Sequence, residues 1–173
     1  VPYTAAEFLE LSRYPWRSVS TDADDRRAVG EAMRLTGISQ LAERRLTSLS
    51  GGERQKVMIA AAIAQETGAI LMDEPTTYLD YAHQVETMEV LARINRERGV
   101  TLMVVTHDVN LAMGLSGNVV AMAGGRVNWT GPPDGLLESG RLDEIYGVRF
   151  RQYSSGCPLE HPVLMPERVG FQI

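Results

Sequence analysis

Two adjacent carboxylates follow a short apolar segment near the middle of the chain, in the stretch Ala69-Ile-Leu-Met-Asp-Glu-Pro75. The apolar segment predicts a strand of a parallel sheet, and open α/β sheets bind ligands at the carboxyl ends of such strands. Asp73 can hold Mg²⁺ there, directly or through water, because Mg²⁺ prefers oxygen ligands and keeps several waters. Glu74 can orient or deprotonate the water that attacks in phosphoryl transfer. The alternative is a pair of solvated loop carboxylates.

A second candidate is a helix start in the stretch Leu49-Ser-Gly-Gly-Glu-Arg-Gln55. Ser50 is a good N-cap, and Glu53 three residues later completes a capping box. Gly51 and Gly52 leave backbone N–H groups uncovered, so an anion can approach the positive end of the helix. The same pattern also fits a capped, buried helix that binds nothing, and spacing alone does not separate the two.

A histidine and an aspartate complete the set of candidate residues. His107 follows a second apolar strand, so it lies at the same sheet edge as the two carboxylates if the strands are parallel neighbours. A single histidine is more often structural than catalytic, and both roles stay open. Asp80 by itself indicates a helix cap. His83 and His161 have no comparable placement and are expected to be ordinary helix and tail residues.

The elements that must position these residues alternate between helix and strand. Helices are predicted over residues 4–13, 22–36, 51–66, 81–98 and 108–115, with a short one around 135–138. Strands are predicted over 69–72 and 101–105, followed by a hairpin of 119–123 and 126–130. This order predicts an α/β fold with a parallel sheet. We expect a helical subdomain over 1–48, an α/β core over 49–150 and an irregular tail over 151–173.

Composition excludes several classes of protein. The net charge of −5 argues against a nucleic-acid binder, which would usually show a basic patch. No apolar run approaches the roughly 20 residues that span a bilayer, and no signal peptide is recognisable. The single cysteine, Cys157, allows no internal disulfide and no cysteine-rich metal site.

In this order and spacing the segments resemble the ATP-binding subunits of ABC transporters. Residues 49–55 match the signature motif, 70–74 the Walker B strand, 77–80 the D-loop and His107 the switch histidine. The stretches Leu79-Asp-Tyr-Ala-His-Gln-Val85 and Thr106-His-Asp-Val-Asn-Leu111 are most similar to importer ATPases for iron-siderophore, haem and cobalamin. The resemblance covers residues 1–147, and it implies the ABC ATPase variant of the P-loop NTPase fold.

The resemblance implies a role for each candidate residue. Glu74 would be the catalytic base, His107 would contact the γ-phosphate, and Asp73 would bind Mg²⁺ through water. ATP would lie between two subunits in head-to-tail contact, most simply a homodimer. The residues implied to bind nucleotide or to link the two sites are Ser50, Gly51, Gly52, Gln55 and Asp80.

The resemblance also implies partners and a location. The region up to about residue 44 would meet an integral membrane permease on the cytoplasmic face of the membrane. A substrate-binding protein would act indirectly, and no nucleic acid would be bound. Import of an iron-siderophore-type substrate is the expected function. The alternatives are an ABC ATPase of DNA repair or of the ribosome, and a non-enzymatic remnant.

One required segment is missing from the sequence. A complete subunit carries a phosphate-binding loop, G-x-x-x-x-G-K-[ST], but the only lysine is Lys56, followed by Val57 inside the signature helix. We therefore expect the chain to be a fragment, lacking also the base-stacking and glutamine-bearing loops. Alone, it should neither hydrolyse ATP at a normal rate nor bind it tightly. Its two parallel strands should expose apolar faces and edges.

Overall fold

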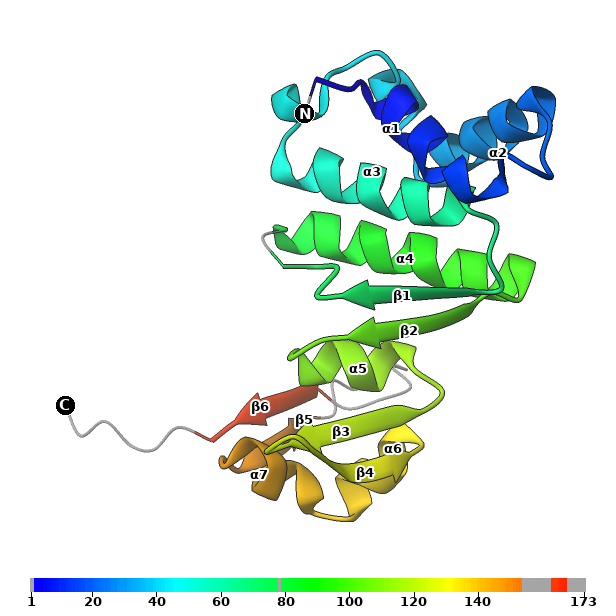
Figure 1. Cartoon of the computed structure of the whole chain (residues 1–173). Helices are drawn as coiled ribbons and strands as arrows, with labels where there is room; N and C mark the ends of the chain where they lie inside the picture. Colours follow the sequence, from blue (N-terminus) through cyan, green and yellow to red (C-terminus); the bar gives the residue numbers. More distant parts are fainter. Residues whose placement is uncertain (1, 78, 154–162, 168–173) are drawn as a thin grey trace. The chain divides into compact units, whose positions relative to one another are not determined.

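The computed structural model describes residues 2–77, 79–153 and 163–167, which divide into two compact units, Val1–Val105 and Thr106–Ile173 (Figure 1). The first unit holds helices α1 to α4 and strands β1 and β2, and the second holds the remaining elements. Among the described residues, no helix is both long enough and apolar enough to cross a membrane.

The first unit begins with two helices that are capped in the same way. α1 (Ala5–Ser12) starts at Thr4 and α2 (Asp22–Leu35) starts at Thr21, and each threonine forms a capping box with the acidic residue three positions later. Both helices pack against α3 (Gly51–Ala64) through their apolar sides. Three short 3₁₀ turns connect these helices: η1 (Tyr14–Trp16), η2 (Ser39–Leu41) and η3 (Leu46–Ser48). The predicted helices are confirmed.

A parallel strand pair follows α3. β1 (Ala69–Asp73) and β2 (Thr101–Val105) pair in parallel register, with Asp73 opposite Val105, and α4 (Tyr81–Arg98) connects them. Gly99 ends α4 in the left-handed conformation, with φ of 63°, which glycine adopts without steric cost. The predicted helix, both strands and their parallel pairing are confirmed, and β1 extends one residue beyond its predicted end.

One face of this strand pair is covered and the other is exposed. Ile70 is 6% exposed, whereas Leu71, its neighbour on the other face, is 72% exposed, and Met103 and Val105 of β2 are also exposed. Successive side chains of a strand point to opposite faces, and α4 packs on only one of them. The expected exposure of apolar strand faces is confirmed.

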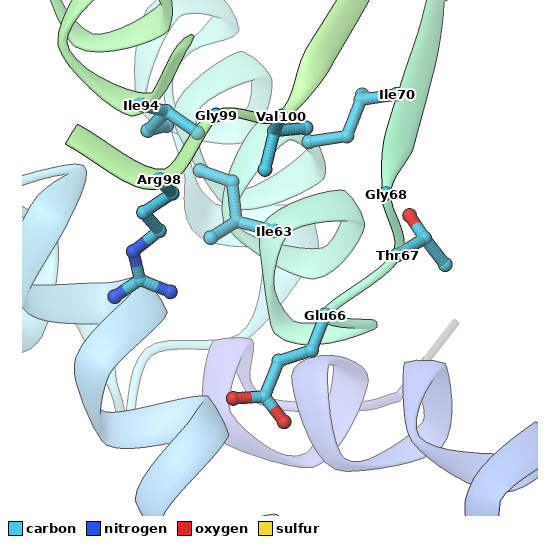
Figure 2. A pocket seen from close by; sticks show the side chains of 9 residues that line it. All are labelled: Ile63, Glu66, Thr67, Gly68, Ile70, Ile94, Arg98, Gly99 and Val100. Carbon is cyan, nitrogen blue, oxygen red and sulfur yellow. The ribbon is translucent and has the colours of Figure 1, made fainter. Parts of the chain in front are cut away.

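A cavity of about 300 Å³ lies at the amino-terminal edge of the strand pair (Figure 2). Thr67 and Gly68 before β1 and Gly99 and Val100 before β2 form part of its wall, together with the last turns of α3 and α4. Ligands of parallel α/β sheets bind at the carboxyl ends of the strands. The cavity lies at the opposite edge from Asp73, so it is not the candidate site.

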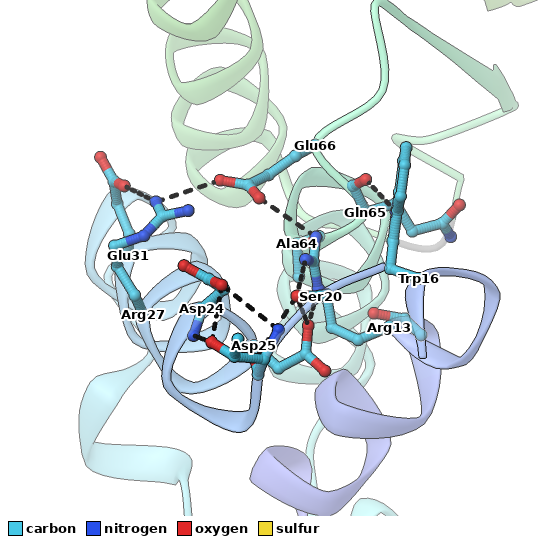
Figure 3. Close-up of polar contacts among 12 residues, drawn as sticks. Arg13, Trp16, Ser20, Asp24, Asp25, Arg27, Glu31, Ala64, Gln65 and Glu66 are labelled. Carbon is cyan, nitrogen blue, oxygen red and sulfur yellow. Dashed lines mark hydrogen bonds and ion pairs between the residues drawn. The ribbon is translucent and has the colours of Figure 1, made fainter. Parts of the chain in front are cut away.

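A buried arginine joins the first three helices. Arg13, at the end of α1, is 4% exposed and donates to the Asp25 carboxylate at 2.8 Å and to the backbone carbonyl of Ala64 at 2.8 Å (Figure 3). It also pairs with Glu66 at 3.2 Å. Arg13 thus cross-links α1, α2 and the carboxyl end of α3, where helix carbonyls have no intrahelical partner.

The second unit packs around one small core. Its elements are α5 (Val109–Leu115), β3 (Val119–Ala123), β4 (Arg126–Gly131), α6 (Pro133–Glu138), α7 (Arg141–Tyr146), β5 (Phe150–Tyr153) and β6 (Val163–Pro166). β3 and β4 form the predicted hairpin, with Gly124 and Gly125 at positive φ in the turn. The core residues are Val109, Met113, Leu136, Leu142 and Leu164.

Two features of the second unit differ from the sequence expectation. Helix α7 was not expected, and residues 151–153 and 163–166, expected as irregular tail, lie in the antiparallel strands β5 and β6. β6 is held by long-range contacts: Leu164 is buried, and the Asn110 side chain bonds both its N–H and its carbonyl. Such contacts leave no local pattern. Cys157 and His161 lie outside the described residues.

The first unit holds the expected helical subdomain over 1–48 together with the stretch up to Val105, and the second unit begins at Thr106. The expected division at residues 48 and 150 stays a prediction.

Candidate active site

The backbone at the end of β1 has an unusual conformation. Glu74 has φ of 48°, in the left-handed region that non-glycine residues rarely adopt. Its N–H donates to the carbonyl of Val105 at 2.9 Å, and buried Pro75 follows it. A conformation of this kind costs on the order of 1 kcal/mol and clusters at functional sites. No residue pattern in the sequence indicates this strain.

The Glu74 side chain is held by the turn that it begins. It is half-buried, and its carboxylate accepts a hydrogen bond from the Thr77 hydroxyl at 3.2 Å, while the Thr77 N–H donates to the Glu74 carbonyl at 3.1 Å. A carboxylate fixed at the carboxyl end of a parallel strand can orient and deprotonate a water. This arrangement favours the functional role of Glu74 over that of a solvated loop carboxylate.

Asp73 is exposed at the last position of β1. Among the described residues, no group of three or more His, Cys, Asp or Glu could hold a metal ion. Mg²⁺ does not require such a group, because it keeps several waters and binds one or two carboxylates together with substrate phosphates. Asp73 therefore fits a magnesium ion that arrives with a nucleotide.

The start of α3 forms the predicted capping box. Ser50 Oγ accepts from the Glu53 N–H at 3.2 Å, and the Glu53 carboxylate accepts from the Ser50 N–H at 2.8 Å. The hydrogen bond from the Ser50 backbone lowers the pKa of Glu53, and Arg44, at 2.8 Å, lowers it further. Ser50 is exposed and can still donate its own hydroxyl proton to an anion.

The glycines that follow are placed where an anion would approach. Gly51 and Gly52 lie in the first turn of α3, where backbone N–H groups have no intrahelical partner. Gln55 lies one turn further along and is half-buried. The structure thus keeps the four candidate residues of this segment together at one helix end.

Asp80 caps α4, as predicted. Its carboxylate accepts from the backbone N–H of His83 at 2.9 Å and contacts His83 Nδ1 at 2.7 Å. The bond from the His83 backbone lowers the pKa of Asp80 most, followed by the bond from the ring. His83 was expected to be an ordinary helix residue; its spacing of three from a helix cap is the signal that could have singled it out.

His107 belongs to the second unit. It is exposed, and its backbone carbonyl accepts from the Tyr146 hydroxyl at 3.3 Å. Asp108 caps α5 as predicted, accepting from the N–H groups of Asn110 and Leu111. The expected proximity of His107 to the two carboxylates stays a prediction, because they belong to the other unit.

The structure thus holds parallel strands joined by a helix, a carboxylate pair at their carboxyl ends and a glycine-opened helix start. These are features of an α/β domain that binds phosphates. Residues 3–77 match the family model described as "ABC transporter". The chain is homologous to the ATP-binding subunits of this family over most of its length.

Relatives of known description come from several bacteria. The ferric enterobactin transport ATP-binding protein FepC of Escherichia coli K12 is 40% identical over 92% of this chain and 61% of its own length. The iron(3+)-hydroxamate import ATP-binding protein FhuC of Bacillus subtilis is 44% identical over 84% of this chain and 55% of its own length. The chain thus spans about three fifths of the length of such relatives.

Solved structures agree with this assignment. An inward-facing structure, described as a transporter of the metal-chelate ABC type, matches 98% of this chain and 68% of its own with a TM-score of 0.82 at 25% identity. The ATP-binding cassette MJ0796, in a dimeric post-hydrolysis state with ADP and Pi, matches 77% of this chain and 58% of its own with a TM-score of 0.67 at 31% identity. The fold is therefore a partial P-loop NTPase fold of the ABC ATPase type.

Proposed function

We propose that this chain is part of the ATP-hydrolysing subunit of an ABC importer for iron-siderophore-type substrates. The observation that carries the proposal is Glu74, a carboxylate held in a left-handed backbone conformation at the carboxyl end of a parallel strand. The names of relatives such as FepC and FhuC, which describe ferric enterobactin transport and iron(3+)-hydroxamate import, support the substrate class.

In the proposed reaction Glu74 removes a proton from the attacking water, and Thr77 keeps its carboxylate oriented. Asp73 holds the magnesium ion, which neutralises charge that develops on the phosphates. His107 contacts the terminal phosphate. Asp80 links the two nucleotide sites of a dimer.

The second half of each site comes from another subunit. Ser50 donates its hydroxyl to the terminal phosphate of a nucleotide held mainly by the partner, and the N–H groups of Gly51 and Gly52 add to this anion site. Gln55 lies close by on the same helix. Both nucleotide sites form only when two subunits meet head to tail, most simply as a homodimer.

The proposed partners follow from the family. The helical region over residues 1–44 faces an integral membrane permease, and a substrate-binding protein delivers the cargo to that permease. The subunit would then lie on the cytoplasmic face of the membrane.

A binding role without hydrolysis is the second candidate for the 173 residues alone. Their only lysine is Lys56 on α3. It forms an ion pair with Glu86 on α4, so its charge is already paired with a carboxylate of this chain. Without a lysine loop on the nucleotide phosphates, we expect the 173-residue chain to bind ATP weakly and to hydrolyse it slowly.

The test compares the full-length product of the gene with its Glu74→Gln variant. We expect Glu74→Gln to lower the ATPase rate by about 100-fold or more, as loss of a general base does, while ATP still binds. Glu97→Gln, an exposed change on α4, is the matched control and should hydrolyse ATP at the original rate. Equal rates for Glu74→Gln and the unchanged protein would refute the proposal.

A further inference from the structure

The first turns of α3 and α4 touch through a glycine and a histidine. A Cβ atom placed on Gly52 would lie 3.1 Å from His83 Cδ2 and 3.3 Å from His83 Cγ. These distances are shorter than ordinary van der Waals contacts, so the imidazole ring already fills the space beside Gly52. Glycine at this position lets the ring lie directly against the backbone of the α3 start.

The same ring is fixed from its other side. His83 Nδ1 lies 2.7 Å from Asp80 Oδ1, and that oxygen also accepts the His83 backbone N–H at 2.9 Å. These bonds lower the pKa of Asp80, and the contact between its carboxylate and the ring is charge-assisted. Asp80 therefore sets the orientation of the ring that packs on Gly52.

A second link lies one turn further along both helices. Lys56 of α3 forms an ion pair with Glu86 of α4. Lys56 is the less exposed partner, at 19%, so this pair is only partly screened by solvent. The amino-terminal ends of α3 and α4 are thus joined at two successive turns.

We propose that His83 is a positioning residue that holds the Asp80 loop and the glycine turn of α3 as one rigid piece. The inference rests on the proposed function, in which Gly52 contacts the terminal phosphate and Asp80 links the two sites. A shift of one segment against the other would misplace two groups that the proposed function places at the same dimer interface, and small misplacements are costly in catalysis.

The test measures kcat and KM for ATP in the full-length protein. We expect His83→Ala to lower kcat by about 3- to 10-fold with KM little changed, because positioning rather than ground-state binding is lost. His83→Asn should recover much of this loss, since its amide can donate to Asp80 from nearly the same place as Nδ1. The exposed Glu89→Gln on the same helix is the matched control and should leave kcat unchanged.

A double variant separates positioning from a purely structural role. Gly52→Ala should lower kcat partly by pushing on the ring, so Gly52→Ala combined with His83→Ala should be about 3-fold more active than Gly52→Ala alone. If His83 only stabilises the fold, kcat per folded molecule is unchanged in His83→Ala, the double variant is no more active per folded molecule than Gly52→Ala alone, and only the melting temperature falls. That pattern would overturn the proposal.

A readout without hydrolysis keeps the two proposals distinguishable. In ¹⁵N-glycine-labelled protein, the Gly52 amide resonance, identified by its loss in Gly52→Ala, should shift in His83→Ala and not in Glu89→Gln. If the unchanged protein hydrolyses no ATP but this shift is seen, the contact holds and the proposed function fails. An unmoved Gly52 resonance in His83→Ala would refute the contact itself.

Discussion

Replacing Arg13 by methionine tests what holds the helical part of the first unit together. The Arg13 side chain is 5% exposed, and its Asp25 and Glu66 partners are 22% and 31% exposed. Removing one member of a fully buried pair costs about 3–5 kcal/mol, because a charge is left without its partner. The partners here are partly solvated, so we expect a loss of about 2–3 kcal/mol in the free energy of unfolding, including the orphaned Ala64 carbonyl.

Arg27 offers a matched control on the same carboxylate. It also pairs with Glu66 at 3.2 Å, but its side chain is 56% exposed. Exposed pairs contribute about 0–1 kcal/mol, so Arg27→Met should cost less than about 1 kcal/mol. The two variants lose the same charge and gain the same side chain, so their difference reports the buried bonds that Arg13 makes to Asp25 and to the Ala64 carbonyl.

The assay is urea unfolding followed by far-ultraviolet circular dichroism, since most helical residues belong to the first unit. Arg13→Met combined with Asp25→Asn should recover part of the loss, because the orphaned carboxylate is neutralised. If Arg13→Met is no more destabilising than Arg27→Met, the buried arginine does not cross-link the three helices, and the reasoning from burial is wrong.

Three further predictions concern stability. Ser50→Ala should destabilise the first unit by about 1 kcal/mol through loss of the N-cap, and Ser50→Thr should restore most of it in the same urea assay; equal stability of all three forms would contradict the capping role. The hydrogen bond from Arg13, then that from Ser20, holds the pKa of Asp25 below its usual 3.8, so its stabilising contribution is complete above that value and is lost as the pH falls below it. Between about pH 6 and pH 3, the melting temperature of Asp25→Asn should therefore fall less steeply at the acid end than that of the unchanged protein. Identical slopes for the two proteins would count against the pair of Arg13 and Asp25. Leu142→Ala should lower the free energy of unfolding of the second unit by about 2–4 kcal/mol, because it leaves a cavity in the core. Unfolding can be followed by the fluorescence of Trp129, which packs against the same core. A loss below about 1 kcal/mol would show that this core is not close-packed.

Local signals in the sequence were sufficient for much of the fold. Ser50, Asp80 and Asp108 each start a helix where a cap followed by a helical pattern predicts one, and Gly99 ends α4 where glycine predicts a stop. The two short apolar runs predict a parallel pair because a long helix separates them. These features depend on neighbours within a few residues, so they can be recognised without knowing the rest of the fold.

Long-range contacts account for what the sequence did not predict. β6 depends on Asn110, more than fifty residues away, and the role of His83 depends on Gly52 of another helix. The strain at Glu74 depends on its bond to Val105 and appears only in the backbone angles. No spacing rule connects these partners, because the fold alone brings them together.

The most direct test of the account is a structure of the full-length Glu74→Gln protein with Mg²⁺ and ATP. We expect a head-to-tail dimer in which Ser50 Oγ and the Gly52 N–H lie within hydrogen-bonding distance of the terminal phosphate of a nucleotide held mainly by the partner. Residue 74 should face the phosphorus atom of a terminal phosphate. A dimer with Ser50 far from any triphosphate, or with residue 74 turned away from it, would contradict the account.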